Sequence, residues 1–175
     1  QKDQKGSEGK SKEKMRQFFL PILFGMLVFT IQAALFPSLP IHRVRPDIVL
    51  IFILYLGLFY PPVSGGLLAF FIGYLMDLFS GNTYGLYAFS RPLLFSLAYL
   101  FRDRFYFEGI LPQFLFVFIF ALGEGLLHQL LLAALNPSPL YSLLFTVLLP
   151  QTFFTALITP LLFALLRKGL SPSPG

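Results

Sequence analysis

The chain stays apolar almost without interruption from Phe18 to Leu166. A soluble domain covers its core with polar residues, and a typical one is about 25% charged. Here 12% of the 175 residues are charged, 56% are hydrophobic and 23 are Phe. No stretch of this interval has enough polar residues to cover a core. The sequence therefore predicts an integral membrane protein whose outer surface faces lipid.

Breaks rich in Pro, Gly and charge divide the apolar interval into six segments. About 20 helical residues cross a hydrocarbon layer of about 30 Å. The block from Asp47 to Ser80 is too long for one crossing and contains YPPVSGG, which predicts two short helices. We expect the first of these to continue through Pro61 and Pro62, with local bilayer thinning or a re-entrant helix as alternatives. The other predicted spans are Phe18–Phe36, Leu86–Phe101, Ile110–Leu135 and Tyr141–Leu166.

The positions of the basic residues predict the orientation. Lys and Arg collect on the cytoplasmic side of membrane proteins. With six spans, Arg43 and Arg45 lie on one side, and a much larger basic group lies on the other. That group is Lys2, Lys5, Lys10, Lys12, Lys14, Arg16, Arg102, Arg104, Arg167 and Lys168. The sequence thus predicts an all-α, compact bundle of six transmembrane helices with both termini cytoplasmic.

Three regions follow from this pattern: a polar basic tail (1–16), a single transmembrane domain (17–168) and a short flexible C-terminal tail (169–175). Residues 1–14 lack apolar periodicity, which predicts disorder or a tail on the membrane surface. Because Met15 opens MRQFFLP, a native start at Met15 stays open as an alternative. We favour an uncleaved first helix over a signal peptide, since the site ending in QAA lacks a small first residue.

The composition and the motifs exclude several classes of function. The chain has no cysteine, which excludes disulfides and cysteine nucleophiles. Neither Gly-x-Ser-x-Gly nor a glycine-rich phosphate loop occurs, so we expect no enzyme activity and no cofactor. The net charge of +5 reflects the basic termini and gives no reason to expect nucleic acid.

Small residues line one side of the predicted third helix. Gly65, Ala69 and Gly73 recur every four residues and lead to Asp77. Small residues let a neighbouring helix approach closely, and the same seam would shelter the carboxylate from lipid. The alternative is ordinary membrane-helix composition, because Gly is common there.

Arg91 is predicted at the same depth as Asp77, near the outer boundary. An ion pair between them would avoid the cost of an isolated charge in hydrocarbon, at least ~2.5 kcal/mol. The alternative is that Arg91 extends to lipid phosphate. Since the residue before proline avoids the helical region, the fourth helix is open to a start at Pro92 instead of Leu86.

A second polar group lies in the fifth span, where Glu124 and His128 are four residues apart. A single Glu-x-x-x-His is a weak metal signal, and we expect no metal. We expect the two side chains to share a hydrogen bond and to mark a helix or partner contact. Thr152, Thr155 and Thr159 share a side of the last helix, where bonding back to their own helix is the default.

The segments RPDIVLIFILYLGLF and GGLLAFFIGYLMDLFSGNTYGLYAFS resemble the MreD family of bacterial rod-shape-determining membrane proteins. The resemblance rests on a Pro-Asp opening of the second helix, a Gly-rich third helix ending in Asp, and a Gly-x-x-x-Gly-Leu turn. It is densest from Arg45 to Ser90, and the Arg91-Pro92 pair has no place in it. The matching residues are Pro46, Asp47, Gly65, Gly73, Asp77, Gly81, Gly85 and Leu86.

The resemblance implies a non-enzymatic scaffold of the bacterial inner membrane that controls cell shape. Such a protein would bind MreC and, through it or directly, the RodA polymerase, its penicillin-binding partner, RodZ and MreB filaments. We expect the face of Gly65, Gly73 and Asp77, or the fold beside it, to dock a partner helix, with membrane lipids around it. The alternative is the solute-binding subunit of a vitamin-type transporter, with Asp77, Asn82, Tyr84 and Arg91 lining a pocket.

Overall fold

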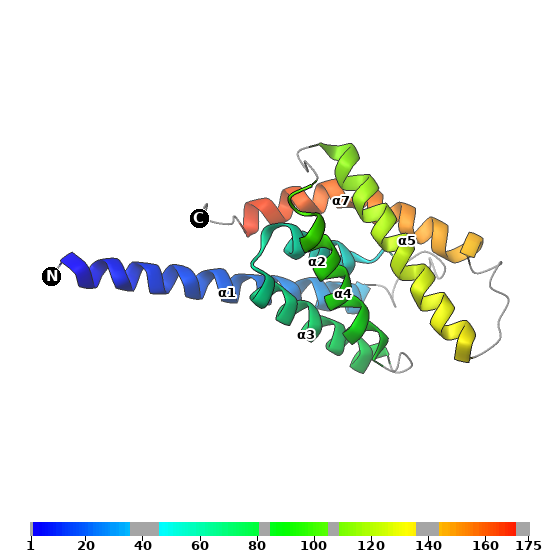
Figure 1. Cartoon of the computed structure of the whole chain (residues 1–175), viewed down its shortest axis with the longest axis horizontal. Coiled ribbons are helices and arrows are strands. Elements are labelled where there is room, and N and C mark those ends of the chain that lie inside the picture. The colour runs from blue at the N-terminus through cyan, green and yellow to red at the C-terminus, as the bar shows by residue number, and fades with distance from the viewer. Residues whose placement is uncertain (1, 36–45, 81–84, 105–108, 136–143, 171–175) are drawn as a thin grey trace.

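The computed structural model describes residues 2–35, 46–80, 85–104, 109–135 and 144–170. All regular secondary structure in these segments is helical (Figure 1). Three stretches are long and apolar enough to cross a membrane: Pro62–Ser80, Ile110–Leu131 and Thr146–Gly169. Three shorter apolar stretches are Phe19–Ala34, Ile48–Phe59 and Leu86–Phe101. The helices are α1 (Lys2–Leu35), α2 (Ile48–Phe59), α3 (Pro62–Ser80), α4 (Leu86–Phe101), α5 (Ile110–Leu135), the π-helical turn η1 (Leu144–Leu148) and α7 (Leu149–Gly169).

Helix α2 forms the centre of the bundle. Every residue from Val49 to Leu58 is buried. The helix is apolar on all sides, as expected for a helix with no exposed face. It contacts α1, α3, α4, α5 and α7. A helix of 12 residues is about 18 Å long, and its short length suits an element enclosed by longer neighbours.

The expectation that α2 continues through Pro61 and Pro62 is wrong. The helix ends at Phe59, and Tyr60 is extended, with φ −113° and ψ 159°. Pro61 disfavours the helical region for the residue before it, and Pro62 suits the first position of α3. The Tyr60 hydroxyl donates to the carbonyl of Leu170 at 3.2 Å, so the α2–α3 corner is fixed to the end of α7.

The seam of small residues on α3 packs against α4 of the same chain. Ala69 is fully buried, and a Cβ added at Gly65 would lie under 3.0 Å from the Phe95 ring. A Cβ added at Gly73 would lie under 3.0 Å from the Tyr87 carbonyl, which is backbone and cannot move aside. The predicted close approach is confirmed. Helix α4 occupies the face of Gly65 and Gly73, so that face is not free for a separate partner helix, and docking beside it stays a prediction.

Helix α4 begins at Leu86, so the alternative start at Pro92 is wrong; Pro92 lies inside the helix. The preceding Gly85 is left-handed, with φ +81°, a conformation that L side chains rarely adopt. The first turn obtains its missing hydrogen-bond acceptor from α3. Asp77 accepts the backbone N–H of Tyr87 at 3.1 Å and that of Ala88 at 2.7 Å.

Helix α1 extends over the segment that was expected to lack structure. It runs without a break from Lys2 to Leu35, and its first half projects beyond the other helices (Figure 1). Lys, Glu and Gln are good helix formers, and a helix already nucleated in the apolar half extends at little cost. The prediction of disorder is therefore wrong for residues 2–14, and the alternative of a tail on the membrane surface stays a prediction.

Helices α5 and α7 form a second pair that crosses beside the others (Figure 1). Thr152, Thr155 and Thr159 are buried on α7, as their shared side predicts. Their hydroxyls donate to helix carbonyls three or four residues earlier, at 2.7 to 2.9 Å. The start of α1 and the end of α7 lie toward the same side of the molecule (Figure 1).

Candidate functional site

Asp47 joins four helices through its backbone and side chain. Its Oδ1 accepts the amide of Leu50 at 3.0 Å and thereby caps α2. The same oxygen accepts from Gln32 Nε2 of α1 at 3.3 Å. The side-chain Oε1 of Gln32 accepts the backbone amide of Val49 at 2.9 Å. The amide of Asp47 donates to the Thr155 hydroxyl of α7 at 3.0 Å. A cap at the start of α2 thus also anchors α1 and α7.

Arg91 of α4 lies at the centre of this polar cluster and is 0% exposed. Its Nη2 is ion-paired with Asp47 Oδ2, and its Nη1 contacts Glu124 Oε2 of α5 at 3.1 Å. The guanidinium also lies over the Tyr87 ring, 5.2 Å from its centroid. A charge enclosed in apolar surroundings persists only with partners of opposite charge, and here two carboxylates supply them.

The prediction that Arg91 pairs with Asp77 is wrong, and so is the alternative that it extends to lipid phosphate. Its ion pairs within the described residues are with Asp47 and Glu124. Asp77 instead accepts the first amides of α4. Because α4 starts at Leu86, Arg91 lies more than one helical turn inside the helix. Helix spacing alone could not distinguish these partners.

Glu124 is buried, with 7% exposed, and is bonded on both oxygens. Its Oε1 accepts from the Ser90 hydroxyl at 2.8 Å, and its Oε2 is held by Arg91. The expected hydrogen bond to His128 is wrong, since Nε2 of His128 has no partner among the described residues. The His128 ring packs edge-on against Tyr87, with centroids 4.6 Å apart.

A small polar hollow of about 60 Å³ lies beside this cluster. Water needs roughly 10–15 Å³ and two to four polar partners, so the hollow has room for water. A drug-sized ligand needs roughly 300–1,000 Å³. No group of three or more His, Asp or Glu that could hold a metal occurs in the described part of the chain. The polar residues that line the hollow are Asp47, Tyr87, Glu124, His128, Gln151, Thr152 and Thr155.

The structure unites residues that the sequence placed in separate groups. Asp47, Arg91 and Glu124 form one cluster, with His128 at its edge, and Pro46 directly precedes the cap. Gly65, Ala69, Gly73 and Asp77 form the α3–α4 seam, and Gly85 ends the turn that follows it. Gly81, Asn82 and Tyr84 lie outside the described residues.

Sequence reasoning missed Gln32 and Ser90 as members of the cluster. Gln32 is a rare amide in the first apolar stretch, and Ser90 directly precedes Arg91. Polar residues inside a membrane helix face the bundle interior, so both could have been proposed as partners. Their assignment to Asp47 and Glu124 needed the arrangement of the helices in space.

A second feature of the site is an apolar groove of about 770 Å³ between α4 and α5. The two helices contact each other much less than α3 contacts α4, so their outer faces diverge. Ser90 and Glu124 are among the residues that line the groove, so it reaches the buried polar cluster. Its apolar lining consists of Leu93, Leu94, Leu97, Phe101, Leu111, Pro112, Leu115, Phe116, Ile119, Phe120, Gly123 and Leu127.

Comparison with known proteins identifies the family. No curated protein and no solved structure matches the chain. One family model, described as rod shape-determining protein MreD, matches residues 12–169, which is nearly the whole sequence. The Pro-Asp cap of α2 and the glycine seam of α3, which carried the resemblance, both have structural roles in the fold. The chain therefore belongs to the MreD family of rod shape-determining proteins.

Proposed function

We propose that this chain is a multi-pass, non-enzymatic scaffold of the bacterial inner membrane that binds MreC within the cell-elongation machinery. Through MreC or directly, it links RodA and its penicillin-binding partner, RodZ and the MreB filaments. Membership of the MreD family supports the role in rod shape determination. The partner contacts are inferred from the surface that the bundle leaves open.

The groove between α4 and α5 is the observation that carries the proposal. Its walls include Leu97, Leu115 and Ile119, which are 39%, 47% and 63% exposed. The chain fills the opposite side of α4 with its own α3. A membrane helix without a hydrophobic driving force associates through close packing and occasional polar contacts. The groove offers an apolar surface for close packing through Leu97 and Leu115, and polar contacts through Ser90 and Glu124.

Gly123 gives the groove a point of close approach. A Cβ added there would have nothing within 4 Å, so the glycine is not required by packing inside this chain. Gly73, by contrast, is required by the neighbouring helix α4. A small residue that faces open space in a membrane helix is suited to contact with another helix backbone. We infer that one transmembrane helix of MreC lies along this groove.

The buried cluster supports a structural role over a catalytic one. Asp47 caps α2 and pairs with Arg91, while Glu124 is held by Ser90 and Arg91. A catalytic acid or base must reach a reacting atom of a substrate. Both carboxylates are bonded to Arg91 of α4, so they join helices of this chain to one another.

The transporter alternative gains no support from the described residues. It requires a polar pocket lined by Asp77, Asn82, Tyr84 and Arg91, whereas the α4–α5 groove is lined almost entirely by apolar residues and the polar hollow beside Arg91 is about 60 Å³. Arg91 is fully buried and Asp77 caps a helix. We therefore keep the scaffold as the single proposed function.

Filling the groove tests the proposal. Gly123→Trp should reduce co-purification of MreC by at least about 10-fold and prevent rescue of rod shape in cells that lack the native protein. The matched control is Leu130→Trp, which changes a 68% exposed residue of α5 that does not line the groove. Equal recovery of MreC with both variants, at equal membrane levels, would contradict docking in this groove. Loss of rod shape with MreC still bound would leave the scaffold role intact but move the contact to another partner.

A further inference from the structure

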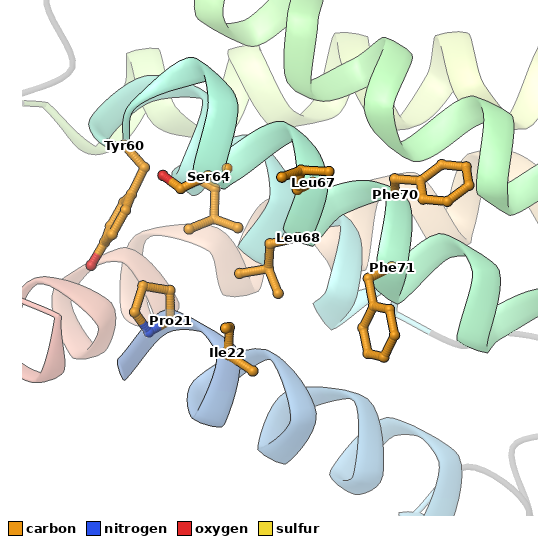
Figure 2. Close-up of a pocket in the computed structure, with 10 residues that line it drawn as sticks. Pro21, Ile22, Tyr60, Ser64, Leu67, Leu68, Phe70 and Phe71 are labelled. Atoms are coloured by element: carbon orange, nitrogen blue, oxygen red, sulfur yellow. The ribbon is translucent and has the colours of Figure 1, made fainter. Parts of the chain in front are cut away.

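A second apolar groove lies between α1 and α3, on the side of α3 away from α4 (Figure 2). It has a volume of about 400 Å³. Leu68 and Phe71 point from α3 toward α1, where Pro21 and Ile22 form the facing wall (Figure 2). Phe71 is 47% exposed and Leu67 is 61% exposed, so the groove opens to the surroundings. Its long axis follows two helices that run along the bundle.

One end of this groove carries hydroxyl groups. Tyr60 and Ser64 lie together at the end nearest Pro21 (Figure 2). Tyr60 donates to the Leu170 carbonyl, which places the end of α7 at the same point. The remaining lining residues carry no polar side-chain atom.

Basic residues surround this same end. Arg167 and Lys168 form the last turn of α7, and the Arg167 guanidinium lies 5.5 Å from the centroid of the Phe59 ring. The adjacent Gly169 packs directly against Phe24 of α1. The basic collar, defined here as Arg167 and Lys168, therefore lies near this end of the apolar groove.

We propose that this groove binds an anionic phospholipid, with an acyl chain between α1 and α3 and its phosphate at the basic collar. Basic pockets between membrane helices on the cytoplasmic side attract anionic headgroups. The hydroxyls of Tyr60 and Ser64 are the polar side-chain groups of the groove lining, and we place the ester groups of the lipid beside them. The site is independent of the α4–α5 groove, which involves different helices.

The lining and the charge nearby favour a lipid as the occupant. Apart from Tyr60 and Ser64, the residues that line the groove carry no polar side-chain atom, and Arg167 and Lys168 lie near one end. This arrangement matches a molecule with an apolar chain and an anionic head. A flexible acyl chain adapts to the volume of about 400 Å³.

Native mass spectrometry of the purified full-length chain tests the proposal. The protein is equilibrated with equal amounts of phosphatidylglycerol and phosphatidylcholine, and the retained lipids are counted. The wild type should retain phosphatidylglycerol preferentially. Arg167→Gln with Lys168→Gln should lower that preference about 10-fold, because each basic residue near the surface contributes substantially to anionic binding. Arg102→Gln with Arg104→Gln is the charge-matched control and should retain the preference.

A second pair of variants tests the apolar part of the site. Ile22→Trp fills the groove and should remove the retained lipid, whereas Leu23→Trp, at a 71% exposed neighbour outside it, should not. Equal retention of both lipids by the wild type would overturn the proposal. It would also be overturned if the two charge-pair variants lost the preference equally, or if a protein co-purified in place of lipid.

Discussion

Helix α4 has two sides with opposite properties. Toward α3, Gly65 and Gly73 allow contacts so close that an added Cβ would overlap its neighbours. Toward α5, the same helix borders a groove of about 770 Å³, and the two helices are joined at one end by Ser90, Arg91 and Glu124. The first side depends on shape and the second on charge. The chain thus closes its own core on one side of α4 and leaves an open groove on the other, where we propose that a partner docks.

The largest effect should come from breaking the charge cluster. Arg91→Gln removes both ion pairs and leaves Asp47 and Glu124 without their cation. Loss of one member of a buried ionic group costs about 3–5 kcal/mol. We expect a loss of this size in the free energy of unfolding, measured by denaturant titration in detergent micelles.

The control for this substitution is Arg102→Gln. The Arg102 side chain is 41% exposed and pairs with Asp103 at 3.6 Å. An exposed pair contributes at most about 1 kcal/mol. If both substitutions had the same small effect, the joining of α4 to α5 by charge would be refuted.

A smaller loss in the free energy of unfolding is expected from Gly73→Ala in α3, which faces the closed side of α4. The new methyl group would meet the Tyr87 carbonyl and the Ala88 backbone. Inserting a methyl group into a packed interface costs about 1–3 kcal/mol. Thermal unfolding should show this loss, while Gly123→Ala, with nothing within 4 Å, should keep or slightly raise the midpoint, because Ala favours a helix more than Gly does. If Gly123→Ala lowered the unfolding midpoint more than Gly73→Ala, the close packing of α3 against α4 at Gly73 would be refuted.

The cap of α4 by Asp77 should contribute about 1 kcal/mol to the free energy of unfolding, which is the usual cost of losing a helix N-cap. Asp77→Ala removes the acceptor for the amides of Tyr87 and Ala88. Because Arg91 is bonded to other carboxylates, the losses of Asp77→Ala and Arg91→Gln should add. The double variant, measured under the same unfolding conditions, decides this point. A strongly non-additive result would restore the ion pair between Asp77 and Arg91.

The smallest effect on the isolated chain should come from Leu97→Ala in the groove wall. Leu97 is 39% exposed, so we expect a change within about 0.5 kcal/mol. The neighbouring Ala98 is fully buried against Gly57, and Ala98→Leu should cost at least about 1 kcal/mol by overpacking. Unfolding of both variants with and without MreC separates the two sides. Only Leu97→Ala should weaken the stabilisation that MreC provides.

Local features of this fold were readable from the sequence, and pairings between distant residues were not. The bounds of α4 and α5 and the small-residue seam follow from runs of apolar residues and a spacing of four. The partner of Arg91 depends on which helices surround α4, and the apolar interval offers Asp47, Asp77 and Glu124 as candidates. The central position of α2 likewise depends on packing, because its short apolar sequence is equally compatible with a re-entrant segment.

The helical N-terminal segment shows the limit of composition as a guide. Its Lys and Glu residues are typical of disorder, yet they also have high helix propensity. The continuity of α1 into an apolar stretch decides between these outcomes. An isolated segment of this composition would lack that nucleus.

Photo-crosslinking in living cells tests the central claim most directly. A photoreactive residue at Leu97 or Leu115 lies in the open groove, whereas one at Phe19 or Leu161 lies on an exposed face elsewhere. We predict crosslinks to the transmembrane helix of MreC from the first two positions and none from the other two. Crosslinks to MreC from Phe19 or Leu161 alone, with the groove positions silent, would contradict the division of α4 into a closed side and a partner side.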